Sequence, residues 1–505
     1  ERTINKFADA AAFAKQCCFG MVTVHSGHGW LLHPFLWPAL YTRTDKWGGK
    51  SIENRARITV AVCDAIRKRV GPNFPVEIRI SGSECYAGGY DIDEGVAFSK
   101  LLDGHVDLIH VSAGSHEVEE VFAVTHPSMF LPDGCNVKFA AEIKKHVKTP
   151  VATVGALGDP DLMEEIIASG QADVVEMARA LIADPDLPLK IRTGRADDIK
   201  KCMRCLACFS SELDNGQDYC AINPEAGRDL EMKYDIPEAK VKKKVLIAGG
   251  GIAGMQAALT CHERGHHVIL CEKSSRLGGT LRCEEKVPFK KNLDYYLDYQ
   301  AKAIEKAGID LRLNTAVTPE YAKNIGADVI ISAMGARPVR PPIPGIDGKN
   351  VLGAEDAYIH PELTGGSAVI LGGGLVGIEL GIYLSMLGKK VTVIEMLDRI
   401  SDGGNFLHIL GLKTEMARQD IDLHLNTKAK EITDKGVLCE TAEGEKFFDA
   451  DTVIYAVGQR PLQEEASALR FCAPEFYQIG DCVTPSNIMN ATGTAFTIAR
   501  SLGRF

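Results

Sequence analysis

Four cysteines crowd into a short stretch near the middle of the chain. Cys202, Cys205 and Cys208 follow a CxxCxxC spacing, and Cys220 comes after eleven further residues. Close turns of this kind let thiolates converge, and four thiolates are the ligands that a [4Fe–4S] cluster requires. A zinc ion held by four cysteines is the alternative, although zinc ribbons usually present two separated CxxC knuckles. The spacing therefore favours an iron–sulfur cluster.

A glycine-rich loop follows the cysteines. It reads Gly249-Gly-Gly251-Ile-Ala-Gly254, it comes directly after an apolar run, and Glu272 closes the next such run. These glycines allow a tight turn and a close backbone approach, so a helix N-terminus can take a pyrophosphate, while the acid accepts from a ribose hydroxyl. The motif predicts a dinucleotide site.

The same arrangement recurs about 120 residues later. Gly372-Gly-Gly374-Leu-Val-Gly377 follows a second apolar run, and Glu395 closes the run after it. Two such units predict two dinucleotides, one a fixed flavin and the other an exchangeable nicotinamide. Because Glu395 would repel a 2′-phosphate and Met396 follows it in place of a base, the sequence favours NADH over NADPH.

Apolar patterns indicate the elements that position these motifs. In the first two hundred residues, strand-like runs alternate with helical patterns such as 138–147 and 159–169. Repeated βα units predict a parallel sheet, and their regular repetition predicts a barrel. Strands are expected at 20–25, 75–81, 106–113, 150–155 and 172–178, and strand–loop–helix units at 245–259 and 368–380.

Composition limits the classes of protein. The chain has 505 residues, 45% hydrophobic and 25% charged, with a net charge of −10, which is typical of a folded globular protein. No apolar run reaches the ~18–20 residues that cross a bilayer. Without a basic tract, we expect neither nucleic acid nor a membrane as partner. The remaining thiols lie scattered in apolar segments, which suits a reducing, cytoplasmic location.

The second half resembles the two-dinucleotide flavoproteins that include glutathione reductase. In that family a late Gly-Asp contacts the flavin ribityl chain, and Gly480-Asp481 matches it. Leu277-Gly-Gly279 further favours a complete FAD, held also by the first glycine loop. The redox-active CxxxxC of the reductases is absent here, so the resemblance implies that electrons leave the flavin towards the cluster.

The first half resembles the old yellow enzyme family. The matching segments are HSGHGW at 25–30, RTDKWGG at 43–49 and ENRAR at 53–57. The order of barrel, cysteines and two dinucleotide units is similar to the long fused branch, which includes 2,4-dienoyl-CoA reductase, 2-enoate reductases, bile-acid-inducible reductases and trimethylamine dehydrogenase. The resemblance implies an α/β protein with a (β/α)8 TIM barrel, an iron–sulfur segment and two Rossmann-like FAD/NAD-binding domains.

The domain boundaries follow from this order. We expect a partial barrel binding FMN and substrate at 1–198, the cluster segment at 199–236, the FAD domain at 237–350 and 461–505, and the NAD domain at 351–460. Only five βα units are visible, whereas a barrel has eight, so about 150 residues of barrel are expected to precede this sequence. FMN binding by this chain alone is therefore an open question.

The resemblance also implies roles in the barrel. His25 and His28 would hydrogen-bond the substrate oxygen and polarise the double bond. Trp30 stands where many relatives carry the tyrosine that protonates the α-carbon, and an indole N–H is too weak an acid, which leaves Tyr86, His126 or water. The residues matching the FMN contacts are Arg79 near flavin N1, and Gly155, Ala156, Ala178 and Arg179 at the phosphate.

These observations together predict an NADH-dependent ene-reductase. Electrons would pass from NADH to FAD, the [4Fe–4S] cluster, FMN and then an unsaturated acid, thioester or ketone. Two alternatives stay open. One is an amine-type dehydrogenase that passes electrons to a partner flavoprotein, and the other is an NADH:acceptor electron-transfer protein. The sequence does not identify the substrate or decide whether the chain forms a homo-oligomer.

Overall fold

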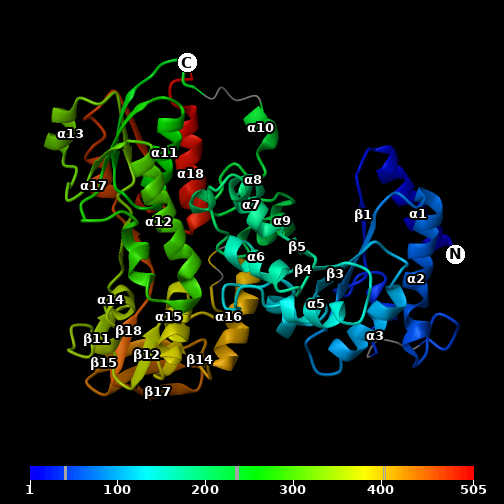
Figure 1. The fold of residues 1–505 in the computed structure, drawn as a ribbon. Coiled ribbons are helices and arrows are strands. Elements are labelled where there is room, and N and C mark those ends of the chain that lie inside the picture. The colour runs from blue at the N-terminus through cyan, green and yellow to red at the C-terminus, as the bar shows by residue number, and fades with distance from the viewer. Residues whose placement is uncertain (39–42, 234–237, 402, 404, 505) are drawn as a thin grey trace. The chain divides into compact units, whose positions relative to one another are not determined.

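The structure is a computed structural model that describes the chain except residues 39–42, 234–237, 402, 404 and 505. The chain divides into two compact units (Figure 1). The first comprises residues 1–181 and 188–196, and the second comprises residues 182–187 and 197–505. The expected boundary between residues 236 and 237 lies outside the described residues.

The first unit is built on a five-stranded parallel sheet. Its strands lie in the order β1-β2-β3-β4-β5, each beside the next in sequence, as in a TIM barrel. They span β1 Val22–His25, β2 Val76–Ser81, β3 Leu108–Ser112, β4 Val151–Val154 and β5 Val174–Glu176. All five strands lie within the ranges that the sequence predicts.

Helices cover the apolar face of this sheet. Their starts follow local sequence: Ser51 caps α2, Asp91 caps α3, and Asp159 followed by a proline begins α6. The helices of the first unit are α1 Arg2–Gln16, α2 Ile52–Val70, α3 Ile92–Leu102, α4 Phe122–Thr125, α5 Val137–Lys144, α6 Pro160–Ala168 and α8 Leu187–Arg192, with α7 Arg179–Ala183 at the boundary of the two units.

The two faces of the sheet differ in chemistry. Val76, Ile78 and Ile80 of β2 are fully buried in the core with α2, whereas the alternate residues of the strand are polar. The same alternation holds along β1 and β3. The polar face therefore carries Thr23, His25, Glu77, Arg79, Ser81, His110 and Ser112.

The second unit contains two five-stranded sheets. In the first, the order β20-β9-β6-β7-β8 brings the C-terminal segment beside the first glycine loop, and α18 Ile488–Ser501 packs against α11 Ile252–Glu263. The strands are β6 Lys244–Ala248, β7 His267–Cys271, β8 Asp310–Arg312, β9 Val329–Ser332 and β20 Glu475–Gln478, with helices α12 Lys291–Lys306 and α13 Pro319–Ile325.

The other five-stranded sheet carries the second glycine loop. Its order is β11-β18-β12-β13-β14, from β11 Val351–Gly353, β12 Ser367–Leu371, β13 Lys390–Ile394, β14 Asp422–His424 and β18 Thr452–Tyr455. Helices α14 Ala354–Ile359, α15 Leu375–Met386 and α16 Phe406–Arg418 accompany it. An antiparallel sheet of β15 Lys428–Thr433, β16 Gly436–Thr441 and β17 Gly444–Asp449 lies alongside, and β10 Ala336–Pro338 pairs with β19 Gln459–Pro461.

The cysteine segment belongs to the second unit. It contains α9 Ala207–Asn215 and α10 Asp229–Lys233, and its buried residues Met203 and Ile222 share a core with α11 and α12. None of the described helices is long and apolar enough to span a bilayer. The predicted parallel α/β architecture is thus confirmed, with strands, glycine loops and helices in the expected order.

Candidate active site and cofactor sites

The two predicted substrate histidines lie together at the carboxyl end of β1. His25 ends the strand opposite Arg79, and His28 lies three residues on with φ +60°. Their rings are 5.1 Å apart. Burial, together with the positive charge of Arg79, lowers the pKa of His25 to about 4 and places the pKa of His28 well below its usual value. Both rings are therefore neutral near pH 7, and each carries one N–H donor.

A second pair of histidines lies beside them. The ring of His116 stacks 5.6 Å from that of His28, and its Nε2 is 2.6 Å from Nε2 of His126. Trp30 meets His116 edge-on at 5.7 Å. His126 is among the proton donors expected from the sequence, whereas His116 is not. The loop of His116 follows β3, and the bridge between His28 and Ser115 joins this loop to the first pair.

Tyr86, another proton-donor candidate, lies in different surroundings. Its ring packs edge-on against Trp37, 6.1 Å between centroids, and no described contact joins it to the four histidines. Burial and the neighbouring Glu84 carboxylate raise the pKa of Tyr86 above its ordinary value. Of the side chains proposed as proton donors, His126 is the one that contacts this cluster.

The predicted FMN phosphate site lies at the ends of β4 and β5. Gly155 has φ +130°, and a Cβ there would lie 2.6 Å from the Asn136 amide nitrogen. Ala156 takes the left-handed conformation, Ala178 begins the turn into α7, and the Arg179 side chain donates to the Pro127 carbonyl.

Two buried donors at these turns lack a partner. Nη1 of Arg179 and Nδ2 of Asn136 are enclosed and make no hydrogen bond within the described residues. Buried donors are normally satisfied, and a phosphate would satisfy both. The residues present therefore fit an anionic group such as the FMN phosphate.

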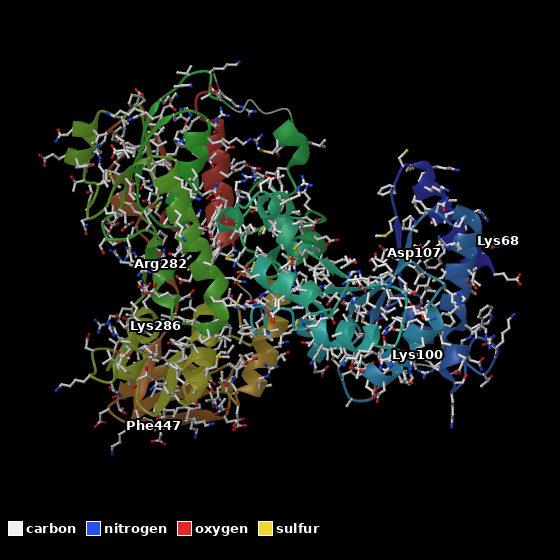
Figure 2. All side chains as sticks on the ribbon, viewed as in Figure 1. Lys68, Lys100, Asp107, Arg282, Lys286 and Phe447 are labelled. Carbon is white, nitrogen blue, oxygen red and sulfur yellow. The ribbon has the colours of Figure 1, made fainter. Side chains whose placement is uncertain are left out.

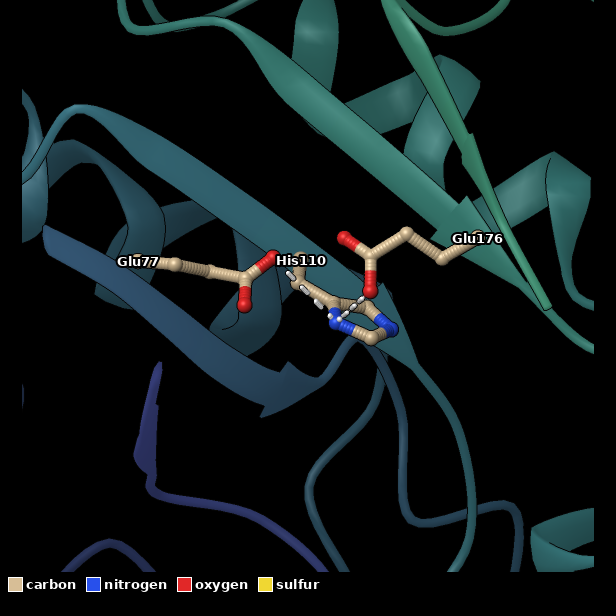
Figure 3. Close-up of side chains that lie close together, drawn as sticks. All are labelled: Glu77, His110 and Glu176. Carbon is tan, nitrogen blue, oxygen red and sulfur yellow. Dashed lines mark ion pairs between the residues drawn. The ribbon is translucent and has the colours of Figure 1, made fainter. Parts of the chain in front are cut away.

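Three titratable side chains converge on the polar face of the sheet (Figure 3). Nδ1 of His110 lies 2.8 Å from Glu176 Oε2 and 3.5 Å from Glu77 Oε1. Burial opposes ionisation of Glu77, but hydrogen bonds with His110, Glu176 and Thr23 outweigh it and hold its pKa at about 2. Hydrogen bonds to the two carboxylates raise the pKa of His110 against the effect of its own burial.

These groups have the donor types of a divalent-metal site, and they also pair with one another and with an arginine. Arg79, directly opposite His110 in the sheet, interacts electrostatically with both glutamates. Burial and the hydrogen bond with Glu77 raise the pKa of Glu176, because two adjoining carboxyl groups favour sharing one proton. We therefore interpret the cluster as an ionic support for Arg79.

The four cysteines form a second polar centre, in the other unit. Arg204 and Leu206 take left-handed conformations between them, which turns the chain back towards the sulfurs, and the amide of Arg204 lies 3.4 Å from Cys202 Sγ. Asn292 and Asn405 donate to the carbonyls of Cys202 and Cys205.

The four cysteines interact with one another. Burial and the neighbouring thiols of Cys202, Cys220 and Cys208 raise the pKa of Cys205. Four thiols that converge in this way are the ligand set that a [4Fe–4S] cluster requires, so the residues present fit that group.

The first glycine loop has the geometry of a pyrophosphate site. A Cβ on Gly249 would lie 2.3 Å from the Ala333 carbonyl, and one on Gly254 would lie 1.8 Å from the Gly249 carbonyl, whereas one on Gly251 would make only an ordinary contact, 3.9 Å from Gly279 Cα. Glu272 accepts hydrogen bonds from the amides of Gly250 and Ser274, at 2.7 Å each. Close packing at the turn and space at the helix start are what a dinucleotide needs.

Gly279 and Asp481 complete this site. Gly279 lies against Gly251, in a turn where Arg282 donates to the Leu277 carbonyl. Arg282 is labelled in Figure 2. Asp481 follows β20 and accepts a hydrogen bond from the Ser486 amide, and burial raises its pKa. The structure thus gathers the residues predicted to bind FAD from both ends of the second unit.

The second glycine loop repeats the first closely. A Cβ on Gly372 would lie 2.4 Å from the Ala456 carbonyl, one on Gly377 would lie 2.1 Å from the Gly372 carbonyl, and Gly374 has nothing within 4 Å. Glu395 accepts from the amides of Gly373 and Leu397. Met396 follows Glu395 in the sequence and is 63% exposed. Because methionine carries no charge, no basic side chain stands next to the acid.

A buried ionic cluster lies behind the second loop. Lys290 contacts Glu284 at 2.8 Å and Glu379 of α15 at 2.5 Å, and Glu379 also contacts His408 of α16 at 2.9 Å. All four side chains are less than 10% exposed. Sequence reasoning did not find this cluster, because its members lie up to 124 residues apart.

Comparisons with known proteins agree with both halves. The family described as NADH:flavin oxidoreductase / NADH oxidase matches residues 1–198, and pyridine nucleotide-disulphide oxidoreductase matches residues 243–495. The NADH oxidase of Thermoanaerobacter brockii is 36% identical over 512 residues, covering 99% of this chain and 77% of that protein. The cinnamate reductase of Clostridium sporogenes is 33% identical over 519 residues, with the same coverage.

A solved structure shows the same arrangement. The complex of 2-naphthoyl-CoA reductase with 2-naphthoyl-CoA matches with a TM-score of 0.93 and 33% identity, covering 99% of this chain and 76% of that one. The five strands of the first unit are thus part of an FMN-binding TIM barrel, as the sequence predicts.

Proposed function

Because the chain belongs to the NADH:flavin oxidoreductase / NADH oxidase family, we propose that it uses NADH to reduce the C=C bond of an α,β-unsaturated acid, thioester or ketone. The family's cofactors are FMN in the barrel, FAD and NAD(H) on the two glycine loops, and a [4Fe–4S] cluster. When bound, these groups supply electron and hydride transfer in the order NADH, FAD, cluster, FMN and substrate.

The neutral histidine pair carries this proposal. His25 and His28 present one N–H each at the same end of the sheet, and burial keeps both rings uncharged. Two such donors can hold one carbonyl or carboxylate oxygen and stabilise the negative charge that develops there as hydride reaches the β-carbon. An amine substrate offers no such oxygen. The similarity to a cinnamate reductase supports the same reaction class.

The α-carbon must also receive a proton, and we assign its delivery to His126 and His116. Their Nε2 atoms are 2.6 Å apart, so one nitrogen donates to the other. Burial, with the neighbouring His116 and two arginines, lowers the pKa of His126 to about 3. Such a ring is neutral near pH 7, so it can release its N–H proton to the α-carbon only as its Nε2 takes up a proton from His116, which is resupplied from solvent. This relay takes the place of the tyrosine missing at Trp30.

The test uses the full-length protein, purified without oxygen. FMN, FAD and iron are measured first, with one of each flavin and about four irons per chain expected. NADH oxidation is then followed with cinnamate, an enone, an enoyl thioester, dimethylamine and a one-electron dye. We expect the moles of NADH oxidised to equal the moles of C=C bond reduced, without any added partner protein.

Variants separate the alternatives. His25→Ala should lower kcat/KM for the enoate roughly 10²–10³-fold and leave dye reduction unchanged, as loss of an oxyanion donor does. His105→Ala is the control, because that exposed histidine pairs with Asp64 away from the site. Equal loss of enoate and dye activity, or turnover of the amine alone, would reject the ene-reductase assignment.

A further inference from the structure

Ser112 lies between a substrate histidine and the flavin-side arginine. It ends β3, its side chain is 1% exposed, and its Oγ lies 3.0 Å from His28 Nε2 and 3.5 Å from Arg79 Nη2. Among the described residues these are the only hydrogen bonds of its hydroxyl group. The hydroxyl therefore has two partners, one on each side.

The chemistry of the partners fixes where the hydroxyl proton goes. A guanidinium has five donors and no acceptor, so Arg79 can only donate to Ser112 Oγ. A buried hydroxyl normally donates its own proton, and within the described part of the chain the acceptor that Ser112 Oγ contacts is Nε2 of His28. Because His28 is neutral, an Nε2 that accepts requires the ring proton to be on Nδ1.

Nδ1 of His28 is also the atom left for a ligand. It makes no hydrogen bond within the described residues, and it is not among the enclosed polar atoms that lack a partner, so it retains access to solvent. The ring's other nitrogen, Nε2, is hydrogen-bonded to Ser112. This hydrogen bond therefore determines that Nδ1 is the nitrogen that donates to a ligand.

We propose that Ser112, oriented by Arg79, fixes His28 as its Nδ1–H tautomer, and that Nδ1 is the atom that donates to the substrate oxygen. Ser112 is a positioning residue, and the inference rests on the proposed function, which places a substrate oxygen at this pair. The arrangement also joins the oxygen-binding histidine to the arginine expected beside the flavin through a single hydroxyl group.

Amide isosteres test which nitrogen donates. Asparagine places an amide donor near the position of Nδ1, whereas glutamine places it near Nε2. The probe is 3-phenylpropanoate, a saturated carboxylate that cannot be reduced, titrated calorimetrically into the oxidised full-length protein. We expect His28→Asn to bind within about threefold of wild type and His28→Gln to bind roughly tenfold or more weakly, the loss of one hydrogen bond to a charged acceptor.

Ser112 is tested by conservative and non-conservative replacement. Ser112→Ala should weaken probe binding several-fold, Ser112→Thr should restore it, and Ser112→Ala should have no further effect in the His28→Asn background. The ¹⁵N spectrum of histidine-labelled wild-type protein tests the tautomer without any substitution, with His28 Nδ1 expected in the protonated range and Nε2 in the unprotonated range.

The outcomes are distinguishable. Tight binding by His28→Gln and loss in His28→Asn, or a protonated Nε2 in the ¹⁵N spectrum, would overturn the tautomer assignment while leaving the ene-reductase proposal intact. Unchanged binding in both variants and in His25→Ala would overturn both, because the histidine pair would then not hold the ligand's oxygen.

Discussion

The side-chain amide of Asn405 donates a hydrogen bond to the backbone carbonyl of Cys205, 2.6 Å away. The same side chain accepts from the hydroxyl of Ser210 and from the amide of His408, which makes it the N-cap of α16. One residue therefore joins the helix beside the second glycine loop to the cysteine loop. The cluster site and the predicted NADH site share a support.

Replacing Asn405 by Asp tests this support. The carboxylate keeps the acceptor role at the helix start but loses the donor to Cys205, and two oxygens then face each other. We expect about 1–3 kcal/mol loss of stability and faster loss of iron to a chelator, followed by the visible absorption of the cluster. Asn487→Asp changes the N-cap of α18 in the same way and should not affect iron retention.

The buried cluster around Lys290 gives a stability prediction. Lys290→Met would leave the carboxylates of Glu284 and Glu379 without their shared cation, and breaking a buried pair typically costs 3–5 kcal/mol. The denaturant midpoint should fall accordingly. Lys286→Met is the matched control, because Lys286, labelled in Figure 2, is exposed and its ammonium group donates to the Ile359 carbonyl and not to a buried carboxylate. Equal effects of the two variants would contradict the role of the cluster.

Substitutions at two glycines of α15 distinguish an effect on nucleotide binding from an effect on the stability of the helix. A Cβ at Gly377 would lie 2.1 Å from the Gly372 carbonyl and distort the loop, whereas one at Gly381 would make ordinary contacts from 3.4 Å. Gly377→Ala should weaken NADH binding by at least tenfold in a fluorescence titration and leave FAD content unchanged. Gly381→Ala should bind NADH like the wild type, and a similar loss there would mean that the loop geometry is not the cause.

The neutral histidines predict a pH dependence of stability. The pKa of His25 is lowered to about 4 and that of His126 to about 3, both below the unfolded value of about 6.5. Between these values the unfolded chain binds more protons, so stability should be full above pH 6.5 and decline as pH falls towards 4.

The check is thermal unfolding between pH 4.5 and 7.5. We expect Tm to fall with decreasing pH, and the fall to be smaller in His126→Asn, which has one depressed histidine fewer. If Tm changed with pH in His126→Asn as steeply as in the wild type, the pKa of His126 would not be lowered by burial in the folded protein.

Local patterns were sufficient to predict much of the architecture. The five barrel strands, both glycine loops and the cysteine spacing are each contained within a few residues, where apolar runs and turns determine the structure. The site residues that were missed depend on strand register. His110 meets Glu77 and Glu176 only because β2, β3 and β5 present alternate residues to one face, and His116 reaches His28 only through a loop closed by Thr125 and Ser115.

The sequence of the barrel strands carries a further signal. β2 alternates apolar and polar residues, in the order Val, Glu, Ile, Arg, Ile and Ser. A period of two means that one face of the sheet is polar, and that face holds the chemistry. Which polar residues meet across strands could not be predicted without the register, and the Lys290 cluster depends on packing between segments far apart in sequence.

The two nucleotide acids have one further consequence. Glu272 and Glu395 each hold two backbone amides, one from the glycine loop and one from the turn after the strand. The protein's own backbone therefore fixes both side chains, so the entropy of ordering them is lost during folding and not during binding. If the second loop binds an exchangeable nicotinamide, as the sequence predicts, the release of that nucleotide should be limited by its own contacts and not by rearrangement of the acid.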